Sequence, residues 1–126
     1  MVINEVMAAN RSVLADEGGD FPDWIELFNP NDVSIDLSDY GLSDDPALPR
    51  KWLLPGVSIP ARGFVVVFAS GKDRRTDTTR LHTNFKISRE AGGHLGLSDP
   101  KGSPVSVIPS YPIQFENVSY GRPPGN

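Results

Sequence analysis

The sequence predicts an all-β fold, a sandwich of two packed antiparallel sheets, on two observations. Twelve glycines and twelve prolines are scattered through the 126 residues, and these two residue types interrupt helices but suit short strands joined by turns. Short apolar or alternating runs recur roughly every ten residues, the spacing typical of sandwiches, and no comparable stretch has helical periodicity. The pattern therefore favours consecutive strands over strands that alternate with helices.

A strand is expected wherever such a run is bounded by turn residues. The expected strands cover residues 2–8, 24–28, 35–37, 40–43, 51–54, 64–69, 84–87, 94–98, 105–108 and 118–120. Turns rich in Pro, Asn, Asp or Gly separate several of them, at residues 29–32, 43–46, 60–63 and 99–102. The run from Phe64 to Ala69 is apolar at both parities, so we expect a central strand with both faces covered.

Length and composition predict one globular domain. The size suits a single compact unit, and 38% hydrophobic with 22% charged residues is a globular mixture. We place the domain at residues 1–121 and interpret residues 122–126, with two prolines and a glycine, as an exit segment or linker. No apolar tract is long enough to cross a bilayer, so membrane insertion is not expected. The lack of cysteine excludes disulfides and thiolate metal sites.

Short motifs follow one another along nearly the whole chain. They are VINEV at residues 2–6, DWIELFNP at 23–30, DLSDYGLSD at 36–44, KW at 51–52, IPARG at 59–63, ASGK at 69–72, LHTNF at 81–85 and SYGR at 119–122. Together these motifs resemble the lamin tail domain family, in its bacterial branch. The resemblance implies an immunoglobulin-like β-sandwich without catalytic residues.

The resemblance also implies a role and a setting. Domains of this family occur in nuclear lamins. In bacteria they are appended to larger proteins, including hydrolases, and these proteins are often exported or membrane-associated. The role that the resemblance implies is tethering or interaction. We therefore expect a parent protein that is secreted or associated with the cell envelope rather than cytoplasmic. The chain has no sustained heptads, so it resembles an excised or appended module and not a filament protein.

Charge is distributed unevenly along the chain. Residues 1–49 carry a net charge of −10 and residues 50–126 carry +6, which gives −4 overall. Half of the basic residues lie between positions 72 and 89, and the candidates for contact with a partner are Lys72, Arg74, Arg75 and Arg80. Such a loop can be solvated, paired internally, or used to bind an acidic protein, anionic lipid headgroups or nucleic acid phosphates. The net acidic chain weakens attraction to polyanions.

An acidic loop at residues 16–20 raises the question of calcium, because carboxylate oxygens are the ligands that Ca²⁺ prefers. An EF-hand loop that starts at Asp16 would need an oxygen donor at its third position and Glu at its twelfth, where the chain has Gly18 and Leu27. Asp44 and Asp45 could contribute ligands if the fold brought them near. We interpret the loop as a solvated acidic turn, with calcium as the open alternative.

Catalytic patterns are not found in the sequence. The only histidines are His82 and His94, without any zinc-ligand spacing, and there is no G-x-S-x-G elbow for a serine nucleophile. Glu26 alternates with Trp24 and Phe28 on one strand face, and we interpret it as a structural, hydrogen-bonded carboxylate. We therefore predict no catalytic site, no cofactor and no metal.

Aromatic residues suggest one more kind of site. Trp24, Tyr40, Trp52 and Tyr111 could form a platform that stacks on sugar rings, but tryptophans among apolar neighbours are typical core residues. The sequence thus favours a non-catalytic interaction or tethering module for a protein partner or a cell-envelope component. The alternatives are a calcium-stabilised carbohydrate-binding module of a secreted hydrolase and an accessory domain that binds nucleic acid or phosphate. Exposed edge strands leave the oligomeric state open.

Overall fold

The computed structural model describes residues 1–7, 16–20, 22–87, 93–111 and 120–121, and these residues form an all-β fold. The strands are β1 (Val2–Met7), β2 (Asp23–Phe28), β3 (Ile35–Asp36), β4 (Gly41–Ser43), β5 (Trp52–Leu53), β6 (Ser58–Ile59), β7 (Phe64–Ala69), β8 (Leu81–His82), β9 (Gly93–Ser98), β10 (Pro104–Tyr111) and β11 (Tyr120–Gly121). The described residues include no helix long and apolar enough to span a bilayer. The predicted exit segment at 122–126 lies outside them.

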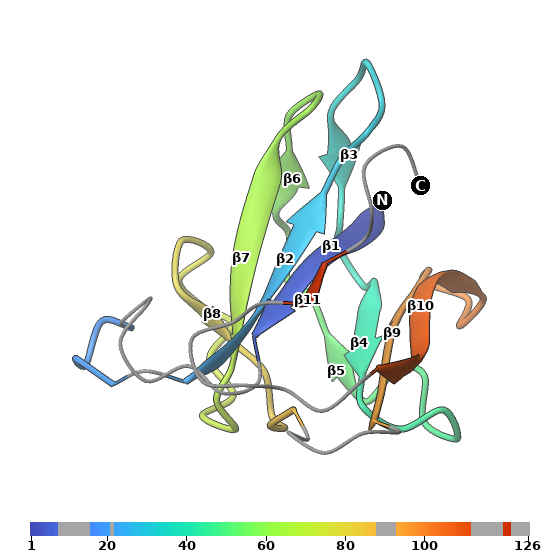
Figure 1. Ribbon diagram of the computed structural model, residues 1–126. Helices are drawn as coiled ribbons and strands as arrows, with labels where there is room; N and C mark the ends of the chain where they lie inside the picture. The colour runs from blue at the N-terminus through green and yellow to red at the C-terminus, as the bar shows by residue number, and fades with distance from the viewer. Residues whose placement is uncertain (8–15, 21, 88–92, 112–119, 122–126) are drawn as a thin grey trace.

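Two sheets form the layers of the sandwich (Figure 1). One sheet has the order β11-β1-β2-β7-β8, and the other has the order β10-β9-β4-β5. A small third sheet pairs β3 with β6. All pairs are antiparallel except β7 with β8, which run parallel. The predicted β-sandwich is therefore confirmed, with one parallel pair that the sequence did not predict.

The core lies between the two large sheets. Ile25, Leu27 and Val67 contribute from one sheet, and Leu95 and Leu97 contribute from the other, all completely buried. Side chains of one strand point alternately to its two faces, which is why Leu95 and Leu97 face inward. Burial of such side chains stabilises the fold by about 1.5–3 kcal/mol each.

β7 differs from the prediction for its apolar run. Its bounds, Phe64–Ala69, are as expected, but it lies between β2 and the two-residue β8, next to the sheet edge. Only its second half is covered on both faces, and Phe64 is 55% exposed. The expectation of full coverage is wrong for this end, because Phe64 lies on the face of the sheet away from the core, where the described residues cover Phe68 but leave Phe64 open.

One predicted strand is absent, and the two-residue strands β6 and β8 were not predicted. Residues 84–87 form no strand; only an isolated bridge joins Lys86 to Ser70. The strand β6 was not expected, because Ser58 and Ile59 lie between turn residues and are too few for a visible alternation. β10 begins at Pro104, and Ser106 and Ile108 are its buried residues near that end.

Candidate functional site

The acidic loop at residues 16–20 is closed by its own hydrogen bonds. The Asp16 N–H donates to the carbonyl of Asp20 at 2.8 Å, and one Asp16 carboxylate oxygen accepts the N–H groups of Gly18 and Asp20 at 2.9 and 3.0 Å. Gly19 has a φ of +82°, a left-handed conformation that glycine adopts without strain. The loop therefore has a defined shape, with the Asp16 carboxylate buried inside it.

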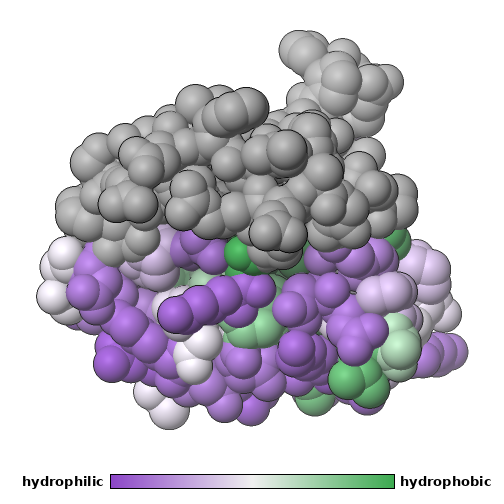
Figure 2. Space-filling model, turned by 60° about the horizontal axis from the view of Figure 1, so that its bottom comes forward, coloured by the Kyte–Doolittle hydropathy of each residue, from purple (hydrophilic) through white to green (hydrophobic). Residues whose placement is uncertain are grey.

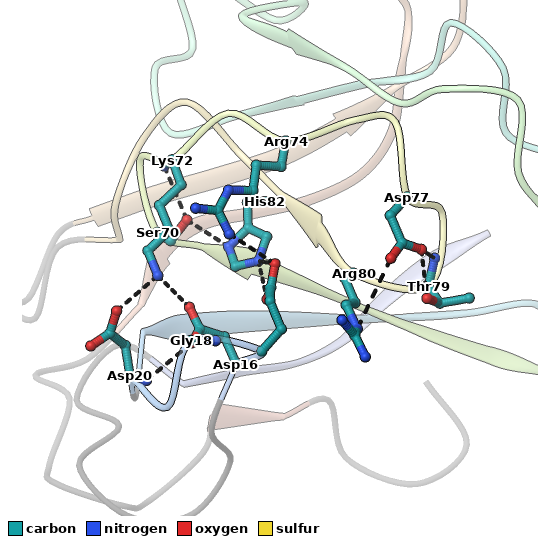
Figure 3. A network of polar contacts seen from close by, with 11 residues as sticks. Asp16, Gly18, Asp20, Ser70, Lys72, Arg74, Asp77, Thr79, Arg80 and His82 are labelled. Atoms are coloured by element: carbon teal, nitrogen blue, oxygen red, sulfur yellow. Dashed lines mark hydrogen bonds and ion pairs between the residues drawn. The ribbon is translucent and has the colours of Figure 1, made fainter.

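Lys72, which follows β7, holds this loop against the sheet (Figure 3). Its Nζ lies 2.5 Å from the free Asp16 oxygen and 2.9 Å from an Asp20 oxygen. Burial raises the pKa of Asp16, but hydrogen bonds from Lys72 and from the N–H groups of Asp20 and Gly18 outweigh it and hold the pKa below its usual value. The two carboxylates in turn raise the pKa of Lys72.

His82 on β8 makes the second connection to the loop. Its ring is completely buried and stacks on Phe68 with centroids 5.2 Å apart. Nε2 lies 2.8 Å from a Glu17 carboxylate oxygen, and Nδ1 lies 2.8 Å from the Ser70 hydroxyl oxygen. Because an ionised carboxylate only accepts, Nε2 donates to Glu17, and in the neutral ring Nδ1 accepts from Ser70.

Glu17 is consequently held as a carboxylate. The largest cause of its low pKa is its own backbone N–H, and the hydrogen bond from His82 comes next. Burial acts in the opposite direction and raises the pKa, and the hydrogen bond from Arg74 lowers it again. Together these effects lower the pKa of Glu17 to about 2. The Arg74 Nη1 lies 3.0 Å from the second carboxylate oxygen. We call the contacts of loop 16–20 with Ser70, Lys72, Arg74 and His82 the clasp.

The clasp places the four basic candidates in different surroundings. Lys72 and Arg74 are turned inward to the acidic loop. Arg80 lies 4.0 Å from Asp77 within its own turn, and Arg75 is exposed and forms no ion pair with the described residues. Internal pairing, one of the expected alternatives, is thus present for three of the four, while contact of these four residues with a partner stays a prediction.

The acidic loop does approach a metal-binding arrangement. One ligand atom each from Asp16, Glu17 and His82 lie within 4.8 Å of one another. However, the Lys72 ammonium already lies between the carboxylates of Asp16 and Asp20, in the place of a cation. The fold also gives Asp44 a different partner, because its carboxylate binds Lys51 at 2.9 Å.

Ser70, His82 and Glu17 form a hydrogen-bonded chain in the order that hydrolases use for nucleophile, base and orienting carboxylate. Sequence reasoning missed this chain, because Glu17 and His82 are 65 positions apart and no local motif marks them. The Ser70 hydroxyl is buried and also accepts the N–H of Lys72 at 3.0 Å. The bonds of Ser70 and Glu17 to His82 connect loop 16–20 to the sheet, and we interpret them as structural.

The two tryptophans among the candidates for a sugar platform are buried, and Tyr40 is half-buried against the core. Trp52 is 2% exposed, and its indole N–H donates to Asp73 at 3.0 Å. Trp24 forms a separate small cluster with Phe68 and Val66 on the outer face of the sheet. Both tryptophans therefore pack inside the domain, as the alternative interpretation predicted. The Tyr111 side chain lies outside the described part.

A groove runs along β7 beside the clasp. It encloses about 530 Å³ and has the apolar side chains of Phe64, Val66 and Phe68 on one side. The opposite wall is the turn from Thr78 to Arg80, and Asp16 and Glu17 border its end. Phe64 is open to solvent and leans on Phe28, with ring centroids 4.7 Å apart.

Large hydrophobic side chains are rarely exposed on the described surface. When the bottom of Figure 1 is turned forward, the described surface is mainly hydrophilic, with small and separate hydrophobic areas (Figure 2). Exposed large hydrophobic residues are few among the described ones: Val33, Leu48, Phe64 and Val105. Of these, Phe64 is the one that lines the groove along β7.

Comparison with known proteins identifies the family. The family model of the Lamin Tail Domain matches residues 1–111, which include all of the clasp and of the groove. No curated protein and no solved structure matches the chain. The lamin tail domain is a non-enzymatic, immunoglobulin-like domain, in agreement with the described fold. On its motifs, its sandwich and the extent of this match, the chain belongs to the lamin tail domain family.

Proposed function

We propose that this domain is a protein-interaction module that binds its partner in the groove along β7. The observation that carries the proposal is Phe64, a large aromatic residue that is 55% exposed on a regular strand and lines a groove of about 530 Å³. An apolar side chain that stays in water has a free-energy cost that contact with a partner removes. Aromatic anchors in such positions carry much of the binding energy in protein interfaces.

The surrounding contacts support a preformed site. Phe28 supports the Phe64 ring from the neighbouring strand, and the clasp fixes the end of the groove through Asp16 and Glu17. A site held in this way loses little conformational entropy when a partner binds. By contrast, Lys72 and Arg74 are already paired with carboxylates, which reduces the charge that these two cations offer to a partner.

A display library of random peptides tests the proposal, with the domain as bait. We expect selected peptides to bind Phe64→Ser at least tenfold more weakly, since about 1.5 kcal/mol or more of apolar contact is lost. Leu48→Ser is the matched control, because Leu48 is also 55% exposed but does not line the groove. Failure to select any peptide, or equal binding by Phe64→Ser, contradicts the proposal.

A further inference from the structure

The first half of β7 has a free backbone edge. β7 pairs with β2 along its full length but with β8 only at Val67 and Phe68. The Phe68 carbonyl accepts the Thr83 N–H, on the side away from β2. Backbone groups of alternate residues point to the same side of a strand, so the N–H groups of Phe64 and Val66 face this edge too. No described segment pairs with them there (Figure 1).

The turn that precedes β8 keeps the edge open. The Asp77 carboxylate accepts both the N–H and the hydroxyl of Thr79, at 3.0 and 2.6 Å, and the Arg80 N–H donates to the Asp77 carbonyl. These bonds bend the chain just before Leu81, so the residues upstream of β8 form the far wall of the groove and do not extend the strand. A gap remains between that wall and the first half of β7.

The fold itself shows that this edge accepts a strand. β8 is an extended piece of chain added to the same edge, and its parallel pairing opposite Val67 uses the Val66 carbonyl, so the groups left free are the N–H and C=O of Phe64 and the N–H of Val66. The occupant suited to this part of the edge is therefore an extended backbone, whose N–H and C=O groups complement those of β7. Side chains of a strand point alternately to its two faces. Every second side chain of the added strand would therefore lie beside Phe64 and Val66, on the same face of the sheet.

We infer that the partner of this domain contributes an extended segment, with apolar side chains at alternate positions, that pairs with β7 at Phe64–Val66 as an additional strand. The inference rests on the proposed function and specifies how the groove recognises its partner. Arg80, whose side chain lies 4.0 Å from Asp77, also lines the groove, but the apolar side chains and the backbone edge are the features that suit an extended segment. The occupant that we propose is a segment of another protein, and pairing with a second copy of the chain is a separate outcome of the test.

The probe is the tightest peptide from the display selection, synthesised in a series with one backbone nitrogen methylated at a time. A methyl group removes the N–H and blocks close approach of two strands. Strand addition predicts an alternating pattern, with binding at least tenfold weaker for every second position and nearly unchanged for those between. A Val66→Pro variant, which removes one edge N–H of β7, should weaken the unmodified peptide to a similar extent while its melting temperature verifies the fold.

The outcomes separate this inference from the proposed function. If Phe64→Ser abolishes binding but methylation shows no alternation and Val66→Pro binds normally, the groove binds its partner without strand pairing and the inference is wrong. If the peptide binds Phe64→Ser normally, the proposed function itself fails. Concentration-dependent dimerisation of the wild-type domain that Phe64→Ser abolishes would also overturn the inference, because the edge would then pair with a second copy.

Discussion

Replacing Lys72 with methionine should lower the free energy of unfolding by about 2–3 kcal/mol, because the buried Asp16 carboxylate loses its counter-charge. The loss of one partner from a fully buried ion pair costs more, but Lys72 is 27% exposed and water partly screens the pair. The same change also frees Asp20 from its ion pair. Urea denaturation of the variant and of the wild-type domain measures the difference.

Lys51→Met is the matched control for this prediction. Lys51 and Asp44 form an ion pair of 2.9 Å in which both side chains are about 30% exposed, and pairs of this kind contribute about 0–1 kcal/mol. The double variant Asp16→Asn, Lys72→Met should recover part of the loss, since no buried charge is then left without a partner and the unpaired Asp20 carboxylate is exposed to water. If Lys72→Met were as stable as Lys51→Met, the clasp would have no stabilising role.

Replacing His82 with leucine should cost about 2 kcal/mol, although the two side chains are similar in volume. The substitution removes the hydrogen bonds to Glu17 and to Ser70 at a completely buried position, and a buried polar group without a partner costs about 1–3 kcal/mol. Ser70→Ala, which removes the bonds of the hydroxyl to His82 and to the Lys72 N–H but keeps the bond of His82 to the Glu17 carboxylate, should cost less. Thermal unfolding at neutral pH compares the three proteins, and equal stability would contradict the prediction.

Acid unfolding gives an independent check on the same residue. The pKa of Glu17 is lowered to about 2 by its own backbone N–H and by His82, so its stabilising contribution is present above the unfolded pKa, near 4.5, and is lost as the pH falls toward 2. Without His82 the folded pKa moves back toward 4.5. The variant should therefore lose less stability than the wild type over that pH range.

Much of the fold follows from alternation along single strands. Leu95 and Leu97 alternate with polar or small residues in the sequence, and both are completely buried in β9. The strand from Phe64 to Ala69 has its predicted bounds because six consecutive apolar residues are enough to define it. Its exposed end could not be predicted, because the sequence does not show which residues cover the face of the sheet away from the core, where Phe68 is buried and Phe64 is not.

The clasp was visible in the sequence only as two segments of opposite charge. Lys72 and Asp16 are 56 positions apart, and Glu17 and His82 are 65 apart, so their contacts depend on how β7 and β8 bring the two loops together. The sequence contained no local signal that His82 would be buried beside Ser70. Internal pairing of the basic loop was one of several alternatives, and only the fold distinguishes the paired Lys72 from the exposed Arg75.

Amide hydrogen exchange of the free domain, measured residue by residue by NMR, tests the central claim most directly. Our account predicts alternation along β7: the amides of Phe64 and Val66 exchange rapidly because they face a free edge, while those of Val65 and Val67 are protected by pairing with β2. If the Val66 amide proved as strongly protected as that of Val67, the edge would already be paired in the free domain. The proposed binding site would then be closed.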